Sequence, residues 1–225
     1  AIMAIQSSRG ALGSLTANSV TPRLNAHYTL TETAEKLEIE KCTIYSKDQK
    51  LLSLRNVAIF KNKLNLITSP SGTGKSVLLK SLHQKLQENS YKAAYIPQDY
   101  NLLTTNVLQN IYLDDSKANI TEAISLLRKV GFTKDDAERM LTDNQNIRTL
   151  SGGEAQRLFL TRYLAHKFDF LFMDEITSAL DKKTEDHIFS ILNTLSSECT
   201  IVINSHTQRI QETDVNHINL IEYLT

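Results

Sequence analysis

The sequence contains few of the glycine and proline residues that interrupt regular structure and few of the cysteine residues that cross-link a chain. Glycine occurs 7 times and proline 3 times among 225 residues, which excludes collagen-like, elastic and Gly/Ser-linker chains. There are 2 cysteines, Cys42 and Cys199, and their wide separation matches neither a disulfide framework nor a metal site. This cysteine usage fits an intracellular, reducing compartment.

An excess of one charge and a long apolar run are also lacking. The 25 basic residues balance the 25 acidic ones, so no overall positive field is available to hold a nucleic-acid backbone. No run reaches the roughly 18 apolar residues that a membrane span requires, and no secretion signal opens the sequence. We therefore expect no nucleic-acid partner, and if the protein serves a membrane, another segment or subunit must supply the span.

The pattern along the chain predicts one α/β core preceded by a leader. Residues 1–36 are rich in Ser, Thr and Asn with loose helical spacing, which favours a weakly helical leader or linker, or the continuation of a transmembrane domain. From residue 37 the runs LEIEKCTI, VAIF, LNLIT, AAYI, FDFLFM and TIVIN predict strands. The run KSVLLKSLHQKLQ predicts a helix after LNLIT, and about seventy residues of helical pattern follow AAYI. A helical lobe at about 100–166, inserted into a parallel sheet, is the expected result.

A glycine-rich octet, Ser69-Pro-Ser-Gly-Thr-Gly-Lys-Ser76, joins a predicted strand to a predicted helix. This context is the one that a phosphate-binding loop requires: backbone amides cradle the phosphates, Lys75 reaches the β- and γ-phosphates, and the Ser76 hydroxyl can ligate Mg²⁺. Ser69 stands where the usual pattern has glycine. The octet predicts a nucleotide site.

Two carboxylates follow the apolar run FDFLFM. Asp174 and Glu175 are expected at the carboxyl edge of the sheet beside the phosphate loop. In that position Asp174 would hold the metal directly or through water, and Glu175 would polarise the attacking water. On its own such a pair is an ordinary acidic turn, so the assignment depends on the loop.

The string Leu150-Ser-Gly-Gly-Glu-Ala-Gln-Arg157 contains two consecutive glycines. Ser151 and Glu154 form an S-x-x-E capping box, but capping alone does not call for the glycines. Bare amides at a helix N-terminus make a second anion site. With these three motifs the chain resembles the nucleotide-binding domain of the ATP-binding cassette (ABC) family, whose signature motif LSGGE matches.

The resemblance implies roles for further residues, in family order along residues 37–225. Gln98 matches the Q-loop glutamine, His206 the switch histidine, and Ser178-Ala-Leu-Asp181 the D-loop at the dimer interface. Tyr45 lies 30 residues before Lys75, where the family commonly has an aromatic residue that stacks on adenine. The family's signature motif contacts ATP held by the opposite subunit.

The resemblance also has departures. Only 23 residues separate Lys75 from Gln98, so a strand pair commonly found there is expected to be missing. The segment TTNVLQNI resembles the T-V-x-E-N-I stretch of exporter domains, with Gln109 in place of the usual acidic residue. This segment and the leader favour export.

The resemblance therefore implies a P-loop NTPase core with a parallel sheet, an N-terminal antiparallel β-subdomain and an inserted α-helical subdomain. It implies an ATPase that uses ATP and Mg²⁺ and forms an ATP-dependent homodimer or heterodimer. The implied partner is the transmembrane domain of a transporter, and the implied location is the cytoplasmic face of a membrane, with the bacterial inner membrane as the first choice. The alternatives are a soluble ABC ATPase acting on nucleic acid or ribosomes, and a nucleotide-dependent regulatory module. The expected ATP-binding residues are Tyr45, Ser69, Pro70, Ser71, Gly72, Thr73, Gly74, Lys75, Ser76, Val77, Ser151, Gly152, Gly153, Glu154 and Asp181. The expected catalytic residues are Glu175, His206 and Gln98, and the expected metal ligands are Ser76, Gln98 and Asp174.

Overall fold

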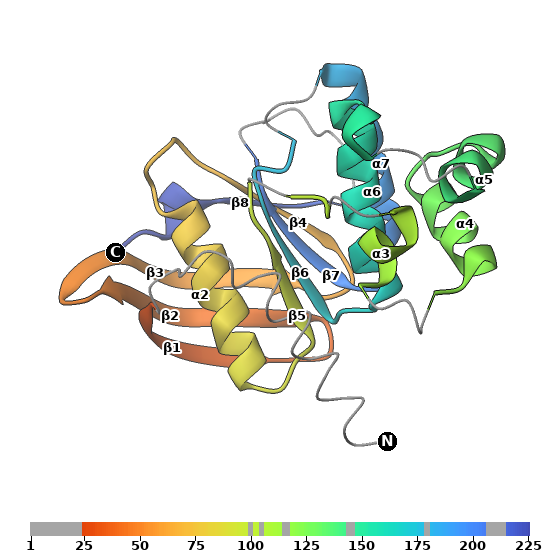
Figure 1. Ribbon diagram of the computed structural model, residues 1–225. Helices are drawn as coiled ribbons and strands as arrows, with labels where there is room; N and C mark the ends of the chain where they lie inside the picture. The colour runs from red at the N-terminus through yellow and green to blue at the C-terminus, as the bar shows by residue number, and fades with distance from the viewer. Residues whose placement is uncertain are drawn as a thin grey trace. The chain divides into compact units, whose positions relative to one another are not determined.

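The computed structural model describes residues 24–98, 101–103, 106–113, 118–142, 147–177, 181–205 and 215–225. The chain divides into two compact units, and each is considered by itself. The sheet unit holds the described residues of 22–98, 168–179 and 192–225, and the helical unit holds those of 99–167 and 180–191 (Figure 1).

The sheet unit begins with an antiparallel sheet in the order β1-β2-β3. Its strands are β1 (Asn25–Glu32), β2 (Lys36–Ser46) and β3 (Gln49–Phe60). The prediction of a weakly helical leader up to residue 36 is wrong for β1. Ala26, Tyr28 and Leu30 alternate toward the hydrophobic core, and this period of two is that of a strand and not of a helix.

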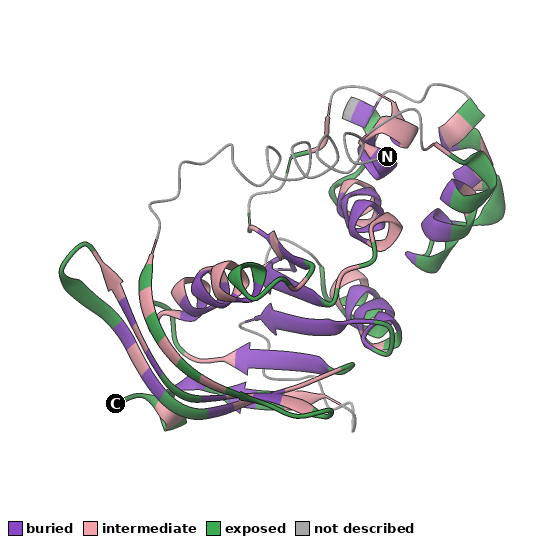
Figure 2. Cartoon of the chain, turned by 90° about the horizontal axis from the view of Figure 1, so that it is seen from below, coloured by how far each residue is buried: buried purple, intermediate pink, exposed green. Residues whose placement is uncertain are grey.

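A second, five-stranded sheet has the order β5-β6-β7-β4-β8, and all its pairs are parallel, which confirms the predicted parallel sheet. Its strands are β4 (Leu64–Thr68), β5 (Ala93–Ile96), β6 (Phe170–Asp174), β7 (Thr200–Asn204) and β8 (Asn216–Asn219). The central strands are buried along almost their whole length, whereas β1–β3 alternate (Figure 2). The sequence pattern gives no sign of β8, because Ile218 is its one apolar residue.

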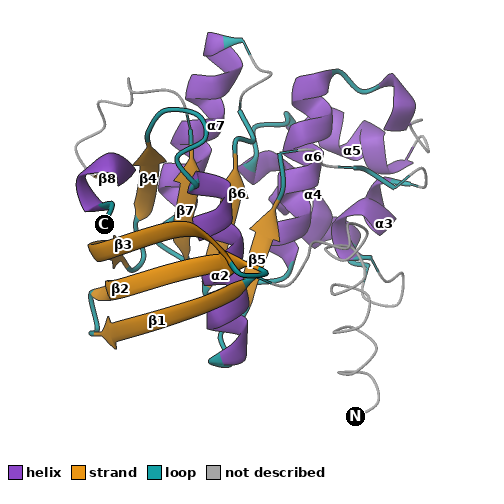
Figure 3. Cartoon of the chain, turned by 90° about the vertical axis from the view of Figure 1, so that its left-hand side faces the viewer, coloured by secondary structure: helices purple, strands orange, loops and turns teal. Residues whose placement is uncertain are grey.

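Helix α2 (Lys75–Glu88) packs against both sheets of this unit. Leu78, Leu79, Leu82 and Leu86 are fully buried in one core with side chains of β2, β3 and β6. Figure 3 shows the strands of the two sheets running in crossed directions beside this helix. The chain passes from α2 to β5 through residues 89–92, all of which are described, and no strand lies between them.

The helical unit contains α3 (Val107–Tyr112), α4 (Ile120–Lys129), α5 (Lys134–Thr142), the 3-10 turn η2 (Ile147–Thr149), α6 (Gly152–Ala165) and α7 (Lys182–Leu195) up to residue 191. A second 3-10 turn, η3 (Leu220–Tyr223), ends the sheet unit. The buried Arg162 of α6 ties two helices together, because its Nε donates to the Asn110 carbonyl of α3 at 2.8 Å and its Nη2 to Asn110 Oδ1 at 3.0 Å. Within the described ranges no helix is long and apolar enough to cross a membrane.

Candidate nucleotide-binding site

The register of the parallel sheet brings three loops to one edge. Ile67, Asn204 and Asp174 stand in one row across β4, β7 and β6. The phosphate loop follows β4, Gln98 follows β5, and Glu175 follows β6, so all three emerge at this edge. Open α/β sheets bind ligands outside the carboxyl ends of their strands.

The phosphate loop is shaped by two glycines in the left-handed region. Gly72 has φ 81° and Gly74 has φ 95°, a conformation that costs other residues free energy. A Cβ at Gly74 would also lie 3.1 Å from Leu52 Cδ1. Gly74 is the N-cap of α2, so the loop delivers its amides and the helix N-terminus to one place.

The ammonium of Lys75 is directed into this loop. Lys75 is 5% exposed, and its Nζ donates to the Ser69 carbonyl at 2.8 Å and to the Pro70 carbonyl at 3.2 Å. The Ser69 and Thr73 hydroxyls also bond to each other, and Thr73 Oγ1 donates to the Pro70 carbonyl at 2.9 Å. Ser69 therefore closes the loop with its own side chain, which glycine at this position could not do. Val77, one turn into α2, packs on the core.

Asp174 receives hydrogen bonds from three side chains. Ser76 Oγ donates to Asp174 Oδ1 at 2.8 Å, and Asn204 Nδ2 donates to the same oxygen. Tyr95 Oη donates to Asp174 Oδ2 at 2.5 Å. Burial first, and then the bond to Asp174, raises the pKa of the Tyr95 phenol well above its ordinary value, so Tyr95 remains a donor.

These residues fit a Mg²⁺ ion. Ser76 and Asp174 supply the hard oxygen ligands that Mg²⁺ prefers. The Oδ1 atom of the fully buried Asn204 has no hydrogen-bond partner in the described structure. A buried acceptor of this kind calls for a polar partner, and a water on a bound metal is one group that fits.

Glu175 follows Asp174 in an unusual backbone conformation. Its φ of 49° lies in the left-handed region, which costs a non-glycine residue about 1–2 kcal/mol. Its amide donates to the Asn204 carbonyl at 3.2 Å, which holds the turn. Such strained residues are concentrated at functional sites, so this conformation is consistent with a functional role for the Glu175 side chain.

The signature motif lies in the helical unit and starts α6. Ser151 and Glu154 form the predicted capping box: Ser151 Oγ accepts from the Glu154 amide, and Glu154 Oε2 accepts from the Ser151 amide at 2.9 Å. The Ser151 hydroxyl and amide bonds lower the pKa of Glu154. A Cβ at Gly152 would meet no heavy atom of the described residues within 4 Å, whereas one at Gly153 would lie 3.3 Å from Thr184 Cγ2. Packing therefore does not explain Gly152.

For the remaining predicted residues within the described ranges, the structure gives a position but no hydrogen bond to Asp174. Tyr45 is half-buried near the end of β2, and its ring packs edge-on against His27 with centroids 6.1 Å apart. Gln98 and Ser71 are exposed. Asp181 caps α7 by accepting from the Thr184 amide at 3.1 Å, and these bonds to Thr184 lower the pKa of its carboxyl. His206 and residues 178–180 lie outside the described residues.

Comparison with known proteins assigns the family. Residues 52–178 match the family described as ABC transporter. The zinc import ATP-binding protein ZnuC of Histophilus somni is 31% identical over 191 residues, which cover 81% of this chain and 71% of that protein. The chain belongs to the ABC transporter family. It is accordingly an ATP-binding component and an ATPase, of a family that works with transmembrane components and dimerises.

Two further likenesses describe this ABC protein. It is 28% identical over 190 residues to the microcin-J25 export ATP-binding/permease protein McjD of Escherichia coli, covering 75% of this chain and 33% of that one. A putative ABC transporter ATP-binding protein from Pyrococcus furiosus shares its fold, with a TM-score of 0.68, 21% identity, and coverage of 84% of this chain and all of the other. The predicted fold class is confirmed.

Two residues that contact Asp174, Tyr95 and Asn204, belong to no sequence motif. Both lie on strands that flank β6, and both contact Asp174. The available signal is weak: each is a polar side chain at or near the carboxyl end of an otherwise apolar run. Only the strand order shows that the two runs flank the acidic strand.

Proposed function

We propose that this ABC protein binds Mg-ATP at the carboxyl edge of the parallel sheet and hydrolyses it to drive a substrate across a membrane. The observation that carries the proposal is the 2.8 Å hydrogen bond from Ser76 Oγ to Asp174 Oδ1. It joins the phosphate loop to the acidic strand, so the two motifs form one site. Neither motif would have this meaning alone.

In the proposed mechanism Lys75 exchanges the carbonyls of Ser69 and Pro70 for the β- and γ-phosphate oxygens. Ser76 and Asp174 would hold Mg²⁺, which supplies charge neutralisation for the phosphates when it is bound. Glu175 orients the attacking water and accepts its proton. Gln98 and His206 contribute to sensing the metal and the γ-phosphate, as the family resemblance implies.

The signature motif acts on the ATP of a second nucleotide-binding domain in this proposal. The open space at Gly152 gives an anion from outside access to the N-terminus of α6, whose helix dipole favours negative charge. Ser151 and Gly153 flank this residue. ATP would then lie between two domains, and dimerisation would depend on ATP. Tyr45 is proposed to stack on the adenine, and Asp181 to lie at the dimer interface.

The proposed partner is the transmembrane domain of a transporter, and the proposed location is the cytoplasmic face of a membrane. Export is supported by the TTNVLQNI segment and by the likeness to McjD, whose name includes export. ZnuC is named for zinc import. The direction of transport therefore stays a prediction.

The experiment that tests this function compares two lysine variants of α2. Lys75→Ala removes the ammonium in the phosphate loop, whereas Lys85→Ala removes one that pairs with Glu88 on the surface of the same helix. Charge-assisted hydrogen bonds contribute about 1.5–3 kcal/mol, so Lys75→Ala should bind ATP roughly 10- to 150-fold more weakly by calorimetry. Lys85→Ala should bind like the parent. Equal ATP affinity of the parent and Lys75→Ala would contradict the phosphate-loop assignment.

A further inference from the structure

Tyr95 reaches Asp174 from the edge strand of the parallel sheet. Its ring is held in place from α2, because Lys80 Nζ lies 5.7 Å from the ring centroid and the His83 ring centroid lies 6.1 Å away. Strand β5 pairs with β6, and α2 lies next to it (Figure 1). The hydroxyl thus has a fixed position, and its 2.5 Å bond goes to Asp174 Oδ2.

The two oxygens of Asp174 have different surroundings. Oδ2 accepts from Tyr95, while Oδ1 accepts from Ser76 and Asn204. An ionised carboxylate has about four acceptor positions, so these three donors leave little freedom to rotate. The oxygen shared with Ser76 is the one on the phosphate-loop side.

We propose that Tyr95 and Asn204 are positioning residues that fix one oxygen each of Asp174, so that the carboxylate is preset beside Ser76 for the metal of Mg-ATP. This inference rests on the proposed function. It follows the general behaviour of metal sites, in which groups that hydrogen-bond a ligand orient it, and their loss typically weakens metal affinity about 10- to 100-fold. Tyr95 and Asn204 need not touch the metal or the nucleotide for this role.

The test separates metal-dependent from metal-independent nucleotide binding in the full chain. Tyr95→Phe keeps the ring and removes only the hydroxyl. We expect the affinity for ADP with excess Mg²⁺ to fall roughly 10-fold, while the affinity for ADP in EDTA stays at the parent value. With Mn²⁺ and ADP as a spectroscopic probe, the bound Mn²⁺ signal should change from that of the parent. A purely structural defect would instead lower both affinities.

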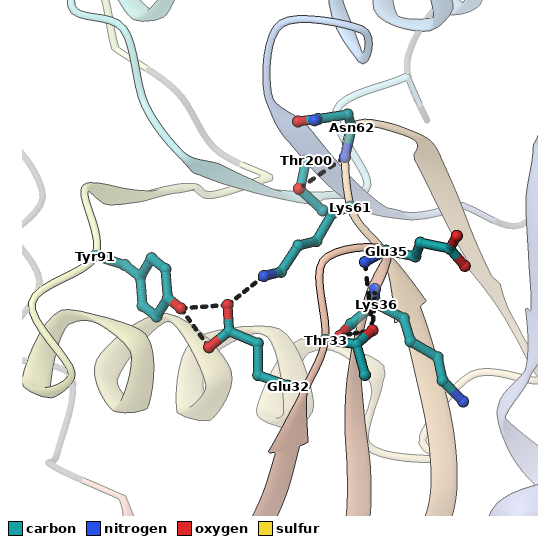
Figure 4. A network of polar contacts seen from close by, with 8 residues as sticks. All are labelled: Glu32, Thr33, Glu35, Lys36, Lys61, Asn62, Tyr91 and Thr200. Atoms are coloured by element: carbon teal, nitrogen blue, oxygen red, sulfur yellow. Dashed lines mark hydrogen bonds and ion pairs between the residues drawn. The ribbon is translucent and has the colours of Figure 1, made fainter.

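Tyr91→Phe is the matched control. Tyr91 Oη also donates to a carboxylate, Glu32, but at an exposed site where Lys61 pairs with the same group (Figure 4). This variant should keep the parent affinity with and without Mg²⁺. Asn204→Ala removes the side-chain donor to Oδ1. If thermal melting shows that Tyr95→Phe does not fold, the same two ADP affinities of Asn204→Ala test the positioning role.

The outcomes distinguish this inference from the proposed function. If the parent binds ADP with a clear dependence on Mg²⁺ and a folded Tyr95→Phe protein keeps that dependence unchanged, the positioning role is overturned and the nucleotide site stands. If the parent shows no Mg²⁺-dependent binding, the proposed function falls, and this inference falls with it.

Discussion

Gly152 is a glycine that the fold does not need, and its replacement separates stability from function. It is the first residue of α6, it is absent from the positive-φ glycines, and an added Cβ would have no heavy atom within 4 Å. Alanine is preferred over glycine inside helices by about 0.5–1 kcal/mol. Gly152→Ala should therefore be as stable as the parent or more stable by up to roughly 1 kcal/mol, which is about 2–4 °C in Tm for a chain of this size.

In the proposed function, the same methyl group would stand in the space through which a phosphate approaches the signature motif. We expect Gly152→Ala to lose at least about 10-fold in ATP turnover, equivalent to roughly 1.4 kcal/mol in the barrier. Initial rates of phosphate release at saturating Mg-ATP measure this loss. Parent-like turnover by a stable Gly152→Ala protein would refute the reasoning, because the space at Gly152 would then have no ligand to admit.

Gly131→Ala is the matched control. Gly131 has φ 88°, and a Cβ there would lie 2.1 Å from His187 Nε2. The backbone penalty of about 1–2 kcal/mol adds to an overpacking cost of about 1–3 kcal/mol. This variant should melt several degrees below the parent, the opposite of the behaviour expected for Gly152→Ala.

Two further predictions concern the carboxylates. Asp174→Asn should lose most of the Mg²⁺ dependence of nucleotide binding while keeping its affinity for ATP in EDTA, because the amide is a poorer metal ligand; calorimetry with and without Mg²⁺ checks this. The pKa of Glu154 is lowered by its bonds to Ser151, so its stabilising effect is present above the ordinary glutamate pKa and is lost as the pH falls through the lower folded value. Glu154→Gln should thus melt below the parent at about pH 7, and the difference should shrink as the pH falls below the ordinary glutamate range. A difference in melting temperature that does not change with pH would contradict a stabilising effect of the ionised carboxylate.

The sequence predicts the elements whose pattern is local. Periodicity predicts α2 and α4, and the apolar runs predict β4 to β7. The motif Ser151-x-x-Glu154 predicts the start of α6 correctly, since a capping box involves only neighbouring residues. β1 is missed although it forms a hairpin with the next strand, because only Ala26, Tyr28 and Leu30 mark its alternation. β8 is missed because its partner β4 is far away in the chain and Ile218 is its one apolar residue.

The same limit applies to the site. Ser76 and Asp174 are both recognisable in the sequence by their motifs, and the structure brings them into contact. Tyr95 and Asn204 belong to no motif, and their meeting with Asp174 depends on the order of three strands. The position of β6 between β5 and β7 is a property of the folded sheet. It cannot be recognised in any short segment of the sequence.

Glu175→Gln tests the central claim most directly. The change keeps the size of the side chain but removes the charge that orients the water and accepts its proton, and loss of a general base costs about 10²- to 10⁴-fold in rate. We predict that the parent hydrolyses Mg-ATP, that Glu175→Gln is slower by this factor, and that the variant still binds ATP and accumulates as an ATP-bound dimer in light scattering. Turnover at the parent rate by Glu175→Gln would contradict the account, and if His206→Ala then abolished turnover, the histidine would replace Glu175 as the base.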